Sequence, residues 1–181
     1  MDLTEKTVST EVIYQGNIID VRKETVQLPN GALSQREIVA HSGAAAVVAL
    51  TEEGRLVLVR QYRKAVEKAL WEIPAGKLDG PEDPLECAKR ELAEETGYQA
   101  EKWTKLTSIY TTPGFSDEVI HIFLATGLTP DDSGGGGDED EFVEVGIFSQ
   151  EEIRAKIRSG ELSDAKSLAG LCAFWVAEGE K

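Results

Sequence analysis

The sequence has 181 residues, 41% of them hydrophobic, which is enough to bury the core of one domain with a small appendage. Its 33 acidic and 19 basic residues give a formal net charge of −14, which argues against nonspecific attraction to nucleic acid or anionic membranes. The two cysteines, Cys87 and Cys172, form no CxxC pair, and no run approaches the roughly 18 apolar residues of a membrane span. We therefore expect a cytoplasmic protein with no membrane or nucleic-acid partner.

The N-terminal region reads as β structure. Residues 12–28 and 32–41 form two alternating runs, and Pro29, Asn30 and Gly31 join them. Asn-Gly between β-rich runs is a strong hairpin signal. We expect residues 1–43 to form an antiparallel β arm.

The next segments predict the start of a mixed sheet and a helix. Residues 44–50 and 55–62 read as two strands joined by a tight turn, and the second alternates so loosely that it should be buried on both faces. From residue 84 to 95, apolar residues recur at helical spacing, and Gly97 supplies the stop.

The rest of the chain predicts more strands and two further helices. Residues 103–112, 118–126 and 141–149 read as strands, and a Gly- and Asp-rich loop, 127–141, separates the last two. One helix should follow Ser149, which has the sequence of a capping box, and another should begin near Ser163. Residues 44–181 therefore predict one α/β domain.

Three carboxylates crowd one turn of the predicted helix. Glu91 and Glu95 are four residues apart and Glu94 is three from Glu91, so all three lie on one side, where like charges repel. A solvated acidic face is one interpretation. The other is a site for a hard divalent cation such as Mg²⁺, which takes oxygen ligands and would turn the repulsion into binding.

The residues around these glutamates decide between the two interpretations. The segment GKLDGPEDPLECAKRELAEETGY, 23 residues long, resembles the Nudix box of the Nudix hydrolases, with Tyr98 where the family usually has an aliphatic residue. The positions that carry the resemblance are Gly76, Glu82, Arg90, Glu91, Leu92, Glu94, Glu95 and Gly97.

The resemblance implies a loop-helix-loop packed on an α/β/α sandwich with a mixed sheet, and hydrolysis of a nucleoside diphosphate linked to another moiety. It implies that Glu91 and Glu95 are the main metal ligands, with Glu94 sharing metals or their waters. Arg90 would hold the glutamates through hydrogen bonds. The implied cofactor is Mg²⁺, with Mn²⁺ as the alternative.

Three further segments, WEIPAGKLD, VRQYR and TTPGFSDE, are similar to those of the ADP-ribose pyrophosphatase subgroup, and Pro113 lies sixteen residues after Gly97. The similarity implies that the Ala75 carbonyl is a metal ligand. It also implies that a further group contacts the substrate: Arg60, Arg63, Glu72 and Pro113. Alternatively, the two arginines are ordinary strand-end charges, and Glu72 pairs with one of them.

In this subgroup the β arm exchanges between two protomers and helps to bind adenine, which implies a homodimer. Arg36 and Glu37 occupy the matching position, where a guanidinium can stack on a base and a carboxylate can accept from an exocyclic amine. Two exposed strand residues with no such role are the alternative.

The subgroup often has its general base on a loop outside the box. The segment GGGGDEDEFVEV matches this description, with Glu141 as the expected base and Glu139 and Asp140 as alternates; a solvated acidic turn is the other interpretation. The predicted reaction is Mg²⁺-dependent hydrolysis of ADP-ribose to AMP and ribose 5-phosphate. The alternatives are a broader nucleoside diphosphate-sugar hydrolase and a sensor that binds ADP-ribose without cleaving it.

Overall fold

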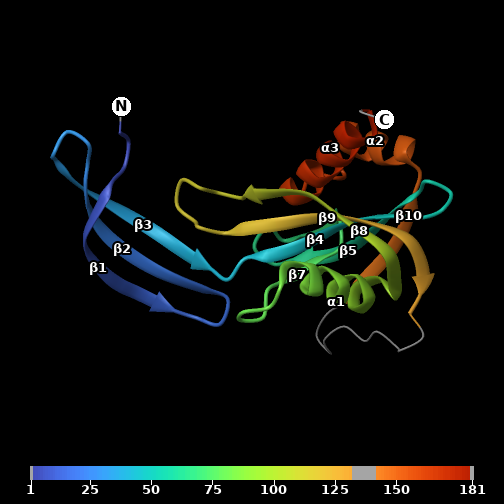
Figure 1. Cartoon of the computed structure of the whole chain (residues 1–181), viewed down its shortest axis with the longest axis horizontal. Coiled ribbons are helices and arrows are strands. Elements are labelled where there is room, and N and C mark those ends of the chain that lie inside the picture. Colours follow the sequence, from blue (N-terminus) through green and yellow to red (C-terminus); the bar gives the residue numbers. More distant parts are fainter. Residues whose placement is uncertain (1, 132–141, 180–181) are drawn as a thin grey trace. The chain divides into compact units, whose positions relative to one another are not determined.

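A computed structural model describes residues 2–131 and 142–179, which form two compact units (Figure 1). The first unit contains Met1–Gly43 together with Tyr110–Val119. The second contains Ala44–Ile109 and Ile120–Lys181, and so holds the whole segment from Gly76 to Gly97.

The first unit is built on an antiparallel sheet with the strand order β1-β2-β3. The predicted turn is present, since the Leu28 N–H donates to the Ala32 carbonyl at 2.8 Å and Gly31 has a φ of 87°. The single run predicted over residues 12–28 is wrong, because the chain reverses after Gly16, whose N–H donates to the Ile19 carbonyl at 3.1 Å. The strands are β1 (Lys6–Gln15), β2 (Ile19–Gln27) and β3 (Leu33–His41).

The second unit is a seven-stranded mixed sheet with the order β10-β5-β4-β9-β8, to which β6 adds beside β5 and β7 beside β4. The pair β4 and β9 is parallel, whereas β4 and β5 are antiparallel. The strands are β4 (Ala44–Leu50), β5 (Leu56–Arg63), β6 (Lys68–Glu72), β7 (Ala75–Lys77), β8 (Tyr98–Tyr110), β9 (Val119–Pro130) and β10 (Val143–Phe148).

The sequence did not predict β6 and β7, which are short and lie on either side of Pro74. A proline and a glycine within so few residues obscure strand periodicity. The predicted strand over 103–112 begins earlier, at Tyr98, and the one over 118–126 extends to Pro130.

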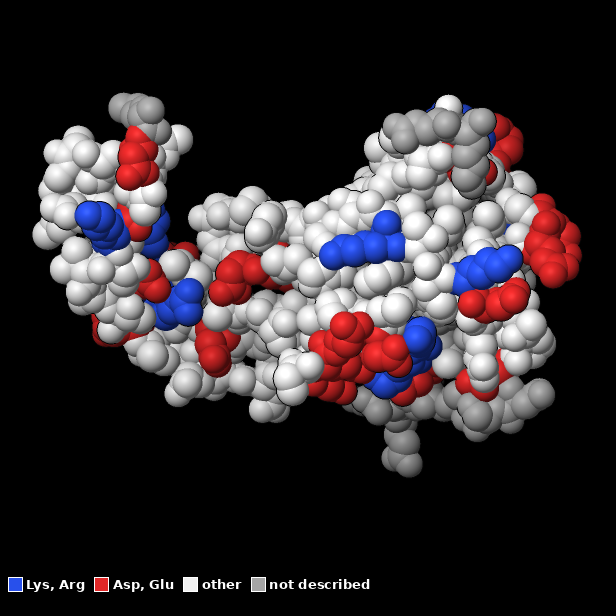
Figure 2. Space-filling view, viewed as in Figure 1, with Lys and Arg blue, Asp and Glu red and all other residues white. Residues whose placement is uncertain are grey.

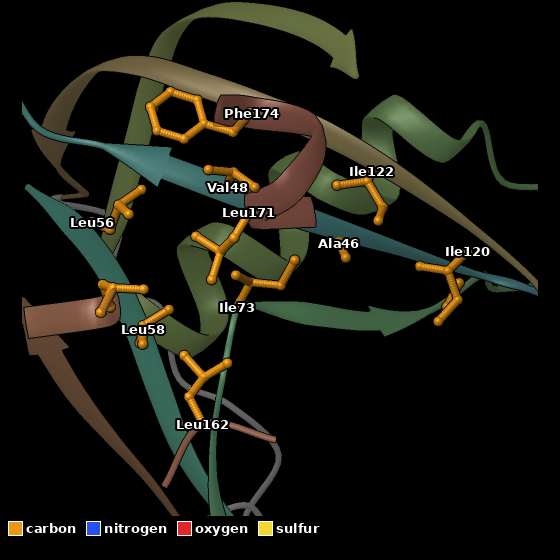
Figure 3. Close-up of a cluster of buried hydrophobic side chains, with 12 residues drawn as sticks. Ala46, Val48, Leu56, Leu58, Ile73, Ile120, Ile122, Leu162, Leu171 and Phe174 are labelled. Carbon is orange, nitrogen blue, oxygen red and sulfur yellow. The ribbon is translucent and has the colours of Figure 1, made fainter. Parts of the chain in front are cut away.

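Helices cover both faces of this sheet, as Figure 1 shows for α1 (Pro84–Thr96) and α3 (Ala165–Gly179). Alternate residues of β4 serve the two layers: Ala46 and Val48 pack in the core beneath α3, and Ala45 and Val47 in the core beneath α1. Figure 3 shows Leu171 and Phe174 of α3 among the side chains of the first core. The structure confirms the predicted α/β/α sandwich with a mixed sheet and an N-terminal antiparallel arm.

The remaining helix, α2 (Gln150–Ser159), begins with the predicted capping box. The Glu152 N–H donates to Ser149 Oγ at 3.2 Å, and the Ser149 N–H donates to the Glu152 carboxylate at 2.7 Å. None of the helices in the described ranges combines the length and the apolar character needed to cross a bilayer.

Candidate active site

The helix α1 begins and ends where its sequence places the caps. Asp83 precedes it and accepts a hydrogen bond from the Leu85 N–H at 2.8 Å, and Pro84 occupies the first turn, where no N–H is needed. Gly97 ends the helix with a φ of 70°, a conformation that glycine adopts without strain. The glutamates therefore lie in a helix whose position along the chain is defined at both ends.

Arg90 is the hydrogen-bond centre of the glutamate cluster. Its Nη1 donates to Glu91 Oε1 at 2.6 Å and to Glu94 Oε2 at 3.0 Å. Its Nε and Nη2 bind the two carboxylate oxygens of Glu82 at 3.2 and 3.1 Å, in the forked geometry that guanidinium allows. The hydrogen bonds to Glu82 are the main cause of the raised pKa of Arg90, and they lower the pKa of Glu82. One permanent cation, Arg90, is thus paired with the carboxylates of Glu82, Glu91 and Glu94.

Gly76 allows the Glu91 carboxylate to lie directly against β7. A Cβ built on Gly76 would stand 1.9 Å from the carboxylate carbon of Glu91, far inside van der Waals contact. Any side chain at this position would displace the glutamate. The glycine of the motif is therefore required for close approach.

Glu95 is held by Ala75, the residue that precedes Gly76 in β7. The Ala75 N–H donates to Glu95 Oε2 at 2.9 Å. Both Glu91 and Glu95 are only 9% exposed, so these carboxylates are largely withdrawn from water at the junction of α1 and β7. Figure 2 shows acidic and basic side chains together over the part of the molecule that α1 occupies.

These donors fit a hard divalent cation. Glu91, Glu94 and Glu95 could contribute carboxylate oxygens from a single stretch of helix, and Ala75 could contribute a backbone carbonyl from the adjoining strand. Within residues 2–131 and 142–179, no three Asp, Glu, His or Cys side chains already converge in the arrangement of a metal site. The carboxylates are instead held by Arg90 and by the Ala75 N–H.

The buried thiol beside the cluster has no chemical role in this arrangement. Cys87 is fully buried and its Sγ lies 3.4 Å from the Lys77 carbonyl. Burial raises the pKa of Cys87 to about 12, so the group is a neutral thiol at neutral pH.

Arg63 and Glu72 form a second charged group on the same unit. Arg63 donates to both oxygens of Glu72, at 2.9 and 2.7 Å, and Lys166 of α3 forms an ion pair with the same carboxylate. Burial raises the pKa of Glu72, but the hydrogen bond from Arg63 and the charge of Lys166 outweigh it, and the net pKa is lowered. Only 2% of Glu72 is exposed, whereas 42% of the Arg63 side chain is. Of the two side chains, Arg63 is the one exposed enough to contact a substrate.

Arg60 lies apart from this group. Its Nη1 is 3.2 Å from Glu144 Oε2, on the adjacent strand β10, where the two residues are directly paired in the register. The structure therefore places the two arginines predicted for the diphosphate against different carboxylates.

Three of the predicted substrate residues belong to the first unit. Arg36 binds Glu5, with Nε at 2.9 Å from Oε2, while Glu37 lines a cavity of about 300 Å³ together with Val39 and Phe115. Successive strand residues face opposite sides of a sheet, which separates Arg36 from Glu37. Pro113 lies in the segment Tyr110–Val119 of the same unit. The predicted general base, Glu141, and its alternates Glu139 and Asp140 lie outside the described residues.

The sequence did not single out the residues of α3 that contact the end of β6 and the residue after it. Lys166 meets Glu72, and Ser167 Oγ accepts from the Ile73 N–H at 2.8 Å, although 94 residues separate each pair. The only local signal was Asp164, whose carboxylate accepts from the Ser167 N–H at 2.9 Å, as in a helix N-cap. Such a signal predicts the start of a helix and says nothing of what the helix contacts.

The motif predicted an α/β/α sandwich that carries a helix of glutamates, and both are present. The glycine-containing strand β7, against which this helix packs, was not predicted. Two family models match the chain: the NUDIX domain over residues 40–170, and the Nucleoside diphosphate sugar hydrolase N-terminal domain over residues 5–39. The chain belongs to the Nudix hydrolase family, whose members generally need a divalent metal ion.

Individual relatives are similar over nearly the whole chain. It is 50% identical to the ADP-ribose pyrophosphatase of Bacillus subtilis (strain 168), over 91% of this chain and 89% of that protein. It is 47% identical to the methanol dehydrogenase activator of Bacillus methanolicus, over 98% of this chain and 96% of that protein. A crystal structure of an ADP compounds hydrolase matches the fold with a TM-score of 0.85 at 21% identity, over 99% of this chain and 98% of that one.

The close approach at Gly76 leads to a first prediction. In Gly76→Ala the new methyl group displaces the Glu91 carboxylate, so binding of Mn²⁺ should weaken by roughly 10-fold to 100-fold, as when a metal ligand loses its support. Electron paramagnetic resonance titration of the free ion measures this affinity. Gly179→Ala is the control, because a Cβ at Gly179 meets nothing within 4 Å. Wild-type affinity in Gly76→Ala would show that the position of Glu91 does not matter to the metal.

Proposed function

We propose that the chain hydrolyses the diphosphate bond of ADP-ribose, giving AMP and ribose 5-phosphate. The observation that supports this most is the Arg90-centred glutamate cluster, present in a chain that is half identical to a protein named ADP-ribose pyrophosphatase. In the reaction, the oxygen of water forms a bond to one phosphorus, the bridging P–O bond breaks, and the water protons are released.

The proposed metal is Mg²⁺, with Mn²⁺ as a substitute, and its ligands are Glu91, Glu94, Glu95 and the Ala75 carbonyl. Divalent ions bound there would neutralise charge on the phosphoryl oxygens and lower the pKa of water. The negative chain needs such ions to admit a negative substrate, because its net charge is −14.

The side chains have distinct proposed roles. Arg90 keeps Glu91 and Glu94 in fixed rotamers, since it hydrogen-bonds both, and it offsets their mutual repulsion. Arg63 binds the diphosphate and is oriented by Glu72, through two hydrogen bonds to one carboxylate. Glu72 then serves the substrate indirectly. Arg60 and Pro113 are proposed to border the substrate, and Glu141, with Glu139 or Asp140 as alternates, to take the proton from water.

A broader nucleoside diphosphate-sugar hydrolase is the second candidate. It is favoured by the match of residues 5–39 to a nucleoside diphosphate sugar hydrolase N-terminal domain. The glutamate cluster would serve both reactions equally, because only the contacts to the sugar and base differ between them. A sensor that binds ADP-ribose without cleaving it is disfavoured, because binding alone would not require three mutually repelling carboxylates.

A substrate panel tests the assignment. ADP-ribose, ADP-glucose, GDP-mannose, NADH and diadenosine polyphosphates are each supplied with Mg²⁺, and products are identified by chromatography. We expect the highest kcat/KM for ADP-ribose, with AMP and ribose 5-phosphate as products. Similar kcat/KM values for several sugars would establish the broader hydrolase, and saturable binding without products would establish the sensor.

Glu95→Gln tests the glutamate cluster itself. The amide can still accept from the Ala75 N–H, so the fold should persist, but the negative charge is lost. Turnover should fall by roughly 10²-fold to 10³-fold, the usual loss when one preorganised electrostatic partner is removed. Glu86→Gln is the matched control on the same helix, because Glu86 is exposed and pairs with Lys89. Near-normal turnover in Glu95→Gln would remove this residue from the metal site.

We also propose that the arm forms a homodimer, in which Arg36 and Glu37 assist in adenine binding. Every residue of β1 is exposed, and apolar side chains such as Val12 (61%) and Tyr14 (56%) face water. Exposed apolar strands tend to pair with another chain.

Light scattering should therefore report twice the chain mass of 19.7 kDa. Val12→Lys should shift the mass toward one chain, because it places a charge in the apolar surface. The control is Val176→Lys, at a residue of α3 that is also exposed (57%). A wild-type monomer with full activity would contradict the shared site.

A further inference from the structure

The start of α3 is bonded to the segment Glu72–Ala75. Lys166 forms an ion pair with Glu72, and Ser167 Oγ accepts from the Ile73 N–H at 2.8 Å. Asp164 ties these two residues together, because its Oδ2 accepts from Ser167 Oγ at 2.6 Å and from Lys166 Nζ at 3.2 Å. One acid at the start of α3 thus organises both contacts to the segment.

The bond between Ser167 and Ile73 is buried, and the bonds of Asp164 and Lys166 are partly buried. Ser167 is fully buried, Ile73 is 1% exposed and Glu72 is 2% exposed. A buried N–H or carboxylate that loses its partner keeps the full cost of desolvation, so such bonds hold their groups in one position. The segment has little freedom to shift while α3 keeps its first turn.

The other end of the segment belongs to the glutamate site. The Pro74 carbonyl accepts from the Val47 N–H at 2.8 Å, which fastens the segment to β4. The Ala75 N–H donates to Glu95 at 2.9 Å, and the Ala75 carbonyl is a proposed metal ligand. A continuous set of contacts therefore joins Asp164 of one helix layer to Glu95 of the other, through four residues of backbone.

We propose that Asp164, Lys166 and Ser167 are positioning residues for the metal site: they orient the Ala75 peptide through the segment Glu72–Ala75 and thereby set the affinity of the glutamate cluster for a divalent ion. The inference rests on the proposed metal-dependent function. It extends the site to a helix on the opposite face of the sheet. A role confined to packing α3 would change stability and leave metal affinity untouched.

The test is Mn²⁺ affinity of the full chain without substrate, measured by electron paramagnetic resonance beside thermal unfolding by circular dichroism. Ser167→Ala and Asp164→Ala should each weaken Mn²⁺ binding by roughly 10-fold, the lower end of the loss seen when support behind metal ligands is removed. Asp164→Asn should restore most of the affinity, because an asparagine oxygen accepts the same hydrogen bonds and caps a helix as well as aspartate. Lys166→Gln is a milder second variant, which serves if either alanine variant does not fold.

Phe174→Leu supplies the control for stability. Phe174 lies on the same helix and is fully buried in the hydrophobic core beneath α3. The Phe174→Leu variant should have a lower melting temperature than the wild type and the same affinity for Mn²⁺.

The outcomes separate the inference from the proposed function. If Ser167→Ala, Asp164→Ala and Lys166→Gln unfold at lower temperature but bind Mn²⁺ like the wild type, the inference is overturned. If the wild type binds no Mn²⁺, it is overturned as well. If the variants lose affinity while the wild type cleaves no ADP-ribose, the positioning role stands and the proposed substrate fails.

Discussion

The structure depends on one electrostatic constraint, the crowding of carboxylates around Arg90. A single guanidinium bonds Glu82, Glu91 and Glu94, in a chain whose net charge is already −14. Without that cation, like charges on one helical turn would push the side chains into solvent. With it, Glu91 stays against β7, where Gly76 leaves room for its carboxylate. The cluster therefore keeps a net negative charge, because one guanidinium faces three carboxylates.

The sheet places the segment beside this cluster within reach of both helix layers. Apart from Leu50, the residues of β4 are alanines and β-branched valines and are buried, so one central strand carries α1 on one face and α3 on the other. The segment Glu72–Ala75 crosses between β6 and β7 and receives bonds from both helix layers. Under the proposed positioning role, loss of the bonds that the first turn of α3 makes to this segment would change the surroundings of Glu95, whereas a change of core packing at Phe174 would not.

Much of the site could be predicted because it is local. The helix from residue 84, its stop at Gly97 and the shared side of the glutamates all follow from spacing within one motif. The arm differs, because the reversal after Gly16 was missed: alternation continues on both sides of a short turn of three residues, 16–18. The short strands β6 and β7 were missed for a related reason, since five or three residues are too few to show a period.

By itself, the sequence determined which residues could form a metal-binding helix, where that helix begins and ends, and the family to which the chain belongs. Only the tertiary structure decided which groups hold those residues in place. It assigned Glu72 to Arg63 and Lys166 within the interior, put Arg60 against Glu144, and brought Ser167 to the backbone of Ile73. The physical reason is distance along the chain: capping and helical periodicity act over a few residues, whereas partners 94 residues apart are brought together only by the tertiary fold.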